Sequence, residues 1–187
     1  MLFAHDTVIA LHGAAALVNT MGGIGPDTAD ERPEILHEPA DLARFVQEWE
    51  WSGHPTVDQQ ALADVRALRP RLHELWQEVP DAAFADVVNA LLADADARPR
   101  LVTHDDLGWH IHATPDDAPI ARRMQVEAAM AMVDVLRAGE RSRLRVCAAD
   151  DCDRVLVDLS RNRSKRYCDH GCGNRVAAAA YRSRRSG

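Results

Sequence analysis

The four cysteines of this chain all lie within its last 41 residues. Four residues separate Cys147 from Cys152, three separate Cys168 from Cys172, and 15 lie between the two pairs. Two close pairs of thiolates are what a tetrahedral Zn²⁺ requires, and a site closed by four protein ligands is structural rather than catalytic. The spacing therefore predicts one structural zinc ion. Two disulfides are the alternative, and they would need an oxidising compartment.

The residues around the cysteines indicate how the site is built. The stretch 148–151 suits a tight knuckle and residues 155–159 have strand character,. Residues 160–164 form a polar turn before residues 165–168 return, which predicts a hairpin between the two cysteine pairs,. Cys168 and Cys172 are four apart, so they share one face in the first turn of a helix that we expect to run to about Arg185. Knuckle, hairpin and helix in this order predict a treble-clef zinc finger over residues 141–187.

Charge is distributed unevenly along the chain. Residues 141–187 hold 12 basic and 5 acidic side chains, a balance of +7, whereas residues 1–140 carry a balance of −14. A basic region on an acidic protein predicts contacts with the phosphates of double-stranded DNA. The alternatives are solvated charge and, for Asn174 and Arg175, a role in bracing the finger, in part through a pair with Asp158. The candidate DNA contacts are Arg161, Arg163, Lys165, Arg166, Arg175, Arg182, Arg184 and Arg185.

Residues 1–140 predict a mainly helical domain with one β-hairpin, which makes the whole chain α+β. Apolar residues recur at helical spacing in five stretches, and alternation around a turn signal at 105–108 predicts the hairpin between Arg98 and Thr114,. We expect Thr56 to cap the third helix and Pro70 to bend or split it. The expected helices cover 9–19, 39–49, 56–79, 80–92 and 119–136.

Two further groups of side chains in the first domain could bind ligands. Tryptophan supplies apolar area with one polar edge, so Asn19, Trp49, Trp76 and Trp109, together with Trp51, are candidates to line a pocket for an unknown small-molecule effector. Burial in the core is the alternative for each of them. His110 and His112, with His104, Asp105 and Asp106, could form a second metal site, although a surface histidine pair is the favoured interpretation.

Other features exclude function classes. The chain has no nucleophile motif and no specific phosphate-binding loop, which argues against an enzyme. It shows no basic start followed by a long apolar run, and no segment approaches the ~18 apolar residues of a membrane span,. We therefore expect a cytoplasmic protein without membrane contact, in which the cysteines stay reduced.

The C-terminal motifs also resemble a known family. The run Cys172-Gly173-Asn174-Arg175, after residues 158–163 and 166–168, is similar to the CGNR zinc finger, and Leu17-Val18-Asn19-Thr20 resembles a run near the start of the ABATE domain. The resemblance spans essentially the whole chain. Tyr167 replaces a common tryptophan, and Ala177 to Ala180 replace a stretch that is often more basic.

What the resemblance implies is a bacterial stress-induced transcription regulator. Residues 1–140 would sense a ligand or signal, and residues 141–187 would bind DNA. The alternative is a zinc-stabilised protein-interaction module without DNA binding. Because a single finger offers little contact area for specific recognition, we also expect a homodimer through the first domain.

Overall fold

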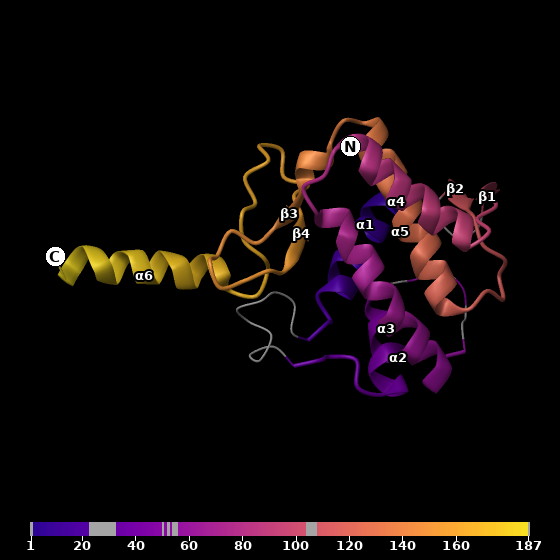
Figure 1. Ribbon diagram of the computed structural model, residues 1–187, viewed down its shortest axis with the longest axis horizontal. Coiled ribbons are helices and arrows are strands. Elements are labelled where there is room, and N and C mark those ends of the chain that lie inside the picture. Colours follow the sequence, from indigo (N-terminus) through magenta and orange to yellow (C-terminus); the bar gives the residue numbers. More distant parts are fainter. Residues whose placement is uncertain are drawn as a thin grey trace.

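The computed structural model describes residues 2–22, 33–49, 51, 53, 56–103 and 108–186. Helices pack into one body, and two short hairpins and one projecting helix complete the chain (Figure 1). The elements in order are α1 (His5–Val18), α2 (Pro39–Glu48), α3 (Gln59–His73), η1 (Glu74–Trp76), α4 (Asp81–Asp94), β1 (Arg100–Thr103), β2 (Trp109–His112), α5 (Ile120–Arg137), η3 (Arg141–Arg143), β3 (Leu144–Val146), β4 (Val155–Val157) and α6 (Cys172–Ser186).

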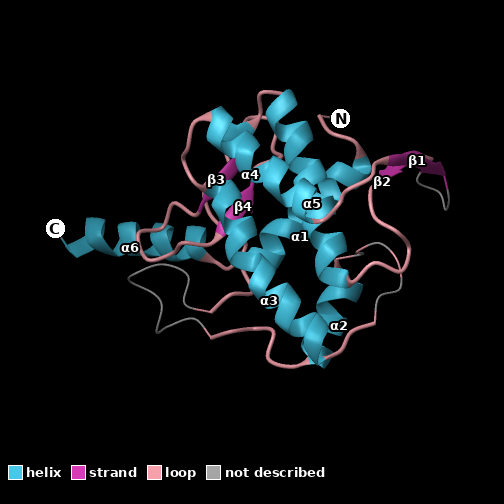
Figure 2. Cartoon of the chain, turned by 45° about the vertical axis from the view of Figure 1, so that its right-hand side comes forward, coloured by secondary structure: helices cyan, strands magenta, loops and turns pink. Residues whose placement is uncertain are grey.

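The helical body is built around α5, which packs against α1, α3 and α4 (Figure 2). Its buried face includes Met124, Ala128 and Met132, which meet Leu11 and Leu17 of α1 in the main core. These side chains follow the helical period seen in the sequence, so burial of apolar area selects the faces that pack. The α+β prediction is confirmed, with a mainly helical first part and a β-hairpin.

The helix boundaries follow local capping chemistry. Pro39 begins α2, and the side chains of Glu38 and Asp41 bond reciprocally to backbone N–H groups across its first turn,. The predicted cap at Thr56 is wrong, because the side chain of Asp58 accepts the N–H of Ala61 at 2.8 Å and begins α3 two residues later. The negative charge of this carboxylate also interacts favourably with the positive end of the helix dipole.

Pro70 lies inside α3 and does not split it, contrary to one expected outcome. The helix ends at His73 and continues as the 3₁₀ turn η1. A proline removes one backbone hydrogen bond, but the buried neighbours Leu68 and Leu72 keep the helix face in the core,. Packing of these leucines in the core thus offsets the free energy lost with the backbone hydrogen bond at Pro70.

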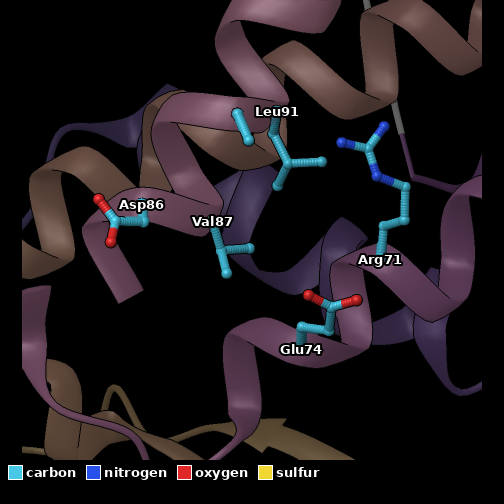
Figure 3. A pocket seen from close by; sticks show the side chains of 6 residues that line it. Arg71, Glu74, Asp86, Val87 and Leu91 are labelled. Carbon is cyan, nitrogen blue, oxygen red and sulfur yellow. The ribbon is translucent and has the colours of Figure 1, made fainter. Parts of the chain in front are cut away.

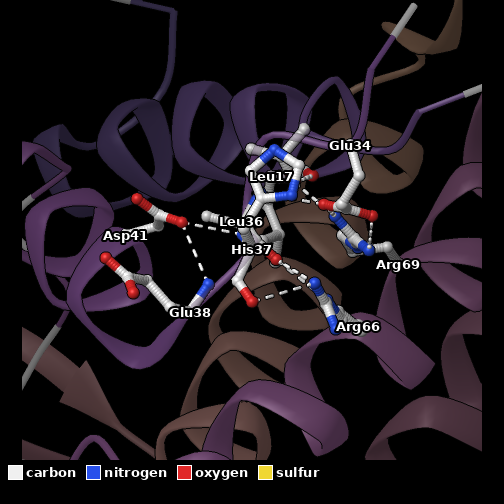
Figure 4. A network of polar contacts seen from close by, with 9 residues as sticks. Leu17, Glu34, Leu36, His37, Glu38, Asp41, Arg66 and Arg69 are labelled. Atoms are coloured by element: carbon white, nitrogen blue, oxygen red, sulfur yellow. Dashed lines mark hydrogen bonds and ion pairs between the residues drawn. The ribbon is translucent and has the colours of Figure 1, made fainter.

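Polar contacts fasten the segment before α2 to α3 (Figure 4). The buried Arg69 binds both carboxylate oxygens of Glu34, at 2.6 and 2.7 Å, and donates to the hydroxyl of Thr20. Burial opposes ionisation of Glu34, but Arg69, the backbone N–H of Leu36 and the charge of Arg66 together lower the pKa of the carboxyl,. Arg66 donates to the carbonyl of Leu36. Two arginines of α3 thus hold the chain that leads into α2.

The first hairpin is confirmed as β1 paired antiparallel with β2. Leu101 lies opposite Ile111 and Thr103 opposite Trp109, so these four side chains share one face of the hairpin,. His110 lies on the other face and is buried. No helix among the described residues has the length and apolar character needed to cross a membrane.

The strand β4 is buried on both of its faces. Val155 and Val157 are 1% and 2% exposed and belong to the main core, where β4 lies against α1. Leu156 is 4% exposed and points the other way, into a small cluster that contains three of the buried cysteines. Successive side chains of a strand point to opposite faces, so the three residues of β4 pack in two different hydrophobic clusters.

Polar side chains of the helical body fix β4 in place. The amide of Asn19 donates to the carbonyl of Val155 at 2.8 Å and accepts its N–H at 2.9 Å. The indole N–H of Trp76 donates to the carbonyl of Leu156 at 3.0 Å. Asn19 therefore acts on this strand as a neighbouring strand would. The division of the chain at residue 140 stays a prediction, and both sides of it meet at β4.

We predict that Asn19→Ala lowers the free energy of unfolding by about 2 kcal/mol, because it leaves two buried backbone groups of Val155 unpaired. Urea unfolding followed by circular dichroism measures the change. Asn89→Ala, on the exposed face of α4, is the control and should shift the value by less than about 0.5 kcal/mol. Equal effects of the two substitutions would contradict the role given to Asn19.

Candidate metal centre

The four cysteine sulfurs lie within 4.8 Å of one another. The sulfur of Cys168 is 3.8 Å from that of Cys152 and 3.4 Å from that of Cys172. A tetrahedron of thiolates about 2.3 Å from a Zn²⁺ ion has sulfur–sulfur edges of about 3.8 Å. The donor set and its spacing both fit zinc, as the sequence predicted. Four protein ligands close the coordination sphere, so the site is structural.

Local backbone geometry brings the ligands together. Cys147 follows β3, and its N–H bonds the carbonyl of Arg154, which closes the knuckle around Cys152. The N–H of Cys168 points at the sulfur of Cys147 at 3.4 Å. Cys172 begins α6, directly after Gly171, whose φ of +80° is a conformation that suits glycine,. A knuckle, a hairpin and a helix form the finger, but the hairpin differs from the prediction: β4 pairs with β3 on the other side of the knuckle, and residues 165–168 form no strand.

The electrostatics of the cluster favour a bound cation when the thiols ionise. Burial raises the pKa of the Cys168 and Cys172 thiols, and the neighbouring sulfurs raise that of Cys172 further,. Four thiolates in this volume would repel one another strongly without a metal charge among them. Zinc supplies that charge and holds all four sulfurs deprotonated, so its binding competes with protons and weakens at acidic pH.

Arg175 contacts the metal centre rather than only solvent. Its guanidinium donates to the sulfur of Cys172 at 3.3 Å and forms an ion pair with Asp151 in the knuckle. The predicted pair between Arg175 and Asp158 is wrong, because Asp158 is fully buried and its charged partner is Arg145, at 3.4 Å. Sequence reasoning missed Asp151, because only the fold brings it beside a residue 24 positions away.

Asn174, in contrast, is exposed, and no hydrogen bond joins its side chain to the described residues. We expected Asn174 to brace the finger beside its ligand, and the structure gives that contact to Arg175. The reason is geometric. The side chain two positions after Cys172 points away from the sulfur cluster on a helix, whereas the side chain three positions on shares its face.

The other predicted DNA contacts fall into two groups. Arg163 pairs with Glu140 at 2.9 Å and Lys165 with Asp169 at 2.9 Å, so acidic groups balance both charges. Arg161 is exposed and Arg166 lies over the ring of Tyr167. The remaining arginines lie on α6, which projects from the body (Figure 1); they are Arg182, Arg184 and Arg185, all exposed.

The structure brings Asn19 and Trp76 to adjacent residues of β4 but places the other candidate pocket residues elsewhere. Asn19 and Trp76 hold β4, Trp49 lies at the end of α2 beside Phe45, and Trp109 is exposed on β2. Trp51 is buried, with its ring against Gly13. The sequence pattern could not show this separation, because tryptophans serve cores and surfaces alike.

Two hollows lie elsewhere. One of about 280 Å³ between η1 and α4 is lined by Arg71, Glu74, Asp86 and Leu91 among others, and by none of the candidate pocket residues (Figure 3). A larger open groove of about 1000 Å³ follows the junction between residues 75–80 and the zinc finger. Trp76 borders it, opposite Arg145 and Arg166.

The candidate second metal site is only partly described. The Nε2 atoms of His110 and His112 lie 3.2 Å apart, and Nδ1 of His110 is 3.0 Å from the carbonyl oxygen of Gly108. His104, Asp105 and Asp106 lie outside the described residues. Within the described part of the chain, the four cysteines are the one group of three or more metal-binding side chains at ligand distance.

We predict that Arg175→Ala weakens zinc binding by about 10- to 100-fold, because it removes a cationic hydrogen bond to a ligand sulfur. Competition against a chromophoric zinc chelator measures the dissociation constant. Asn174→Ala is the matched control in the same helical turn and should leave zinc affinity unchanged. Similar losses in both variants would mean that the helix start, and not the guanidinium, sets the affinity.

We further predict that removing zinc loosens β4 and the part of α1 that holds it. Hydrogen exchange of α1 peptides near Asn19 should rise after chelation and fall again when zinc is restored, because metal binding is coupled to folding of its site. Peptides from the distant β1–β2 hairpin provide the internal control. Unchanged exchange in α1 would show that β4 stays docked without the metal.

Comparison with known proteins agrees with this architecture. A family model described as "Putative stress-induced transcription regulator", the ABATE domain, matches residues 11–139, and the CGNR zinc finger model matches residues 143–185. No curated protein matches the chain. The first family model covers more than half of the 187 residues. The chain therefore belongs to the ABATE family, which carries that description, and has a C-terminal CGNR zinc finger.

Proposed function

We propose that this protein regulates transcription by binding double-stranded DNA through its C-terminal helix and finger, under the control of a signal received by the helical body. One observation carries the proposal: α6 projects away from an acidic body and presents three exposed arginines near its end (Figure 1). A projecting cationic helix is a shape that can approach the major groove.

The basic side chains of the finger differ in how readily they could bind a phosphate. Arg163, Lys165 and Arg175 already have acidic partners, so binding a phosphate would first have to displace a carboxylate. Arg182, Arg184 and Arg185 are exposed on the helix that projects from the body. The proposal therefore places the main phosphate contacts on α6, with Arg161 and Arg166 of the finger beside it.

The proposal also includes a site where the protein would bind an effector. The groove of about 1000 Å³ at the junction touches Trp76 of the body and Arg166 of the finger, so an effector bound there would contact both. Trp76 also holds β4, which links that position to the zinc site. This role is regulatory rather than enzymatic, and the reducing cytoplasm is the compartment that keeps four thiols available for zinc.

We predict that replacing Arg182, Arg184 and Arg185 together with Ala weakens binding to a pool of random-sequence duplexes. The slope of log affinity against log salt should fall by about three, because each lost phosphate contact removes about 0.9 from the slope. Fluorescence anisotropy at several salt concentrations measures both quantities.

The control replaces Arg44, Arg71 and Arg98 of the body with Ala, which changes net charge equally at exposed positions. It should leave affinity and slope unchanged. If the α6 variant also binds as the wild type does, α6 is not the contact surface. If the zinc-loaded wild type itself does not bind the duplexes at low salt, the protein-interaction module becomes the better description.

A further inference from the structure

One face of α6 points away from the zinc site. Cys172 lies in the sulfur cluster, and Asn174 lies about 200° around the helix from it, because successive residues of an α-helix are about 100° apart,. Side chains three, four, seven and eleven positions after Asn174 share its side of the helix. These residues form what we call the outer face of α6: Asn174, Ala177, Ala178, Tyr181 and Arg185, all of them exposed.

The outer face is small in the middle and cationic at its edges. Ala177 and Ala178 carry only a methyl group, so another molecule can approach the helix backbone closely there. Arg182 and Arg184 flank the face on opposite sides, about 280° and about 120° from Cys172,. A helix in the major groove needs this pattern, because its flanking cations reach the phosphates of the two strands while small residues let it approach the base edges.

Charge and composition favour DNA over a protein as the occupant of this face. α6 carries four arginines and no acidic residue, so its charge complements a polyanion,. Alanine is depleted at protein interfaces, which need larger side chains as anchors at their centre. The one aromatic residue of the outer face, Tyr181, accepts a hydrogen bond at its hydroxyl from Arg185 at 3.3 Å. The face therefore suits a polyanion.

Asn174 is the residue of the outer face best suited to distinguish bases. Its side-chain amide has both a donor and an acceptor, and no hydrogen bond joins it to the described residues,. In the major groove an asparagine donates to N7 of adenine and accepts from its N6 amino group. Asn174 also lies in the first turn of α6, and the recognition helix of helix-turn-helix proteins places its N-terminal residues on base edges,.

We propose that Asn174 contacts an adenine in the major groove and thereby selects an A·T pair at one position of the DNA site. The flanking Arg182 and Arg184 supply affinity that does not depend on sequence, and Asn174 adds the base preference. The inference rests on the proposed binding of DNA by α6.

Selection from a pool of random duplexes by the zinc-loaded, full-length protein measures the base preference. The wild type should enrich a site with at least one A·T pair, and Asn174→Ala should lose the preference at that position while keeping the others. Ser183→Ala is the matched control, because Ser183 is an exposed polar residue on the opposite side of α6. It should select the wild-type site.

An adenine analogue tests the contact directly. 7-Deazaadenine lacks the N7 acceptor and still pairs with thymine. When it replaces the contacted adenine in the selected site, the wild type should bind at least about fivefold more weakly. Asn174→Ala should lose a similar factor on natural DNA and no more on the analogue. Fully additive losses would contradict a contact between the two groups.

Two neighbouring alanines test which side of α6 meets the DNA. Ala178 lies on the outer face and Ala179 on the side of Cys172, and both are exposed. Leucine has a high helix propensity, so either substitution preserves α6. Ala178→Leu should weaken duplex binding at least about tenfold by blocking close approach, whereas Ala179→Leu should not. Zinc content and circular dichroism establish that each variant is folded.

The outcomes separate this inference from the proposed function. A wild type that binds duplexes without any sequence preference, or that shares its preference with Asn174→Ala, overturns the inference alone. Equal effects of Ala178→Leu and Ala179→Leu also overturn it. A wild type that binds no duplex at low salt overturns both the inference and the proposed function.

Discussion

The structure depends on one short strand that is buried on both faces. Val155 and Val157 of β4 enter the helical core, and Leu156 between them enters the cysteine cluster. A strand alternates its side chains, so neither core can lose β4 without exposing the other. The two bonds from Asn19 replace the neighbouring strand that β4 lacks on the edge away from β3, and Trp76 adds a bond to the carbonyl of Leu156. Zinc site and helical body thus form one cooperative structure.

The finger differs from an isolated zinc module in what stabilises its fold. A small zinc module with few apolar residues usually owes its fold to the metal alone. Here the finger also uses the core of a much larger body, because Val155 and Val157 of β4 pack in that core. A signal that alters the packing around Trp76 or Asn19 has a direct physical path to the zinc site, through backbone atoms of β4.

Charge and apolar surface are sorted to different ends of the molecule. The arginines of the finger that lie near carboxylates stabilise the fold, as Arg143 and Arg163 do on Glu140. The arginines of α6 extend into solvent, and the most exposed tryptophan lies at the other end, on the hairpin. The cationic surface and the exposed apolar surface therefore do not compete for the same area of the molecule.

The sequence by itself determined the helices, the first hairpin, the zinc ligands and the family. These features follow from local rules, because helical period, turn residues and cysteine spacing act over a few positions. Only the tertiary structure decided that Arg175 contacts a ligand sulfur while Asn174 faces solvent, that Asp58 caps α3, and that Asn19 holds a strand 136 residues away. Those roles depend on which distant segments meet, and burial of β4 between two cores sets that meeting.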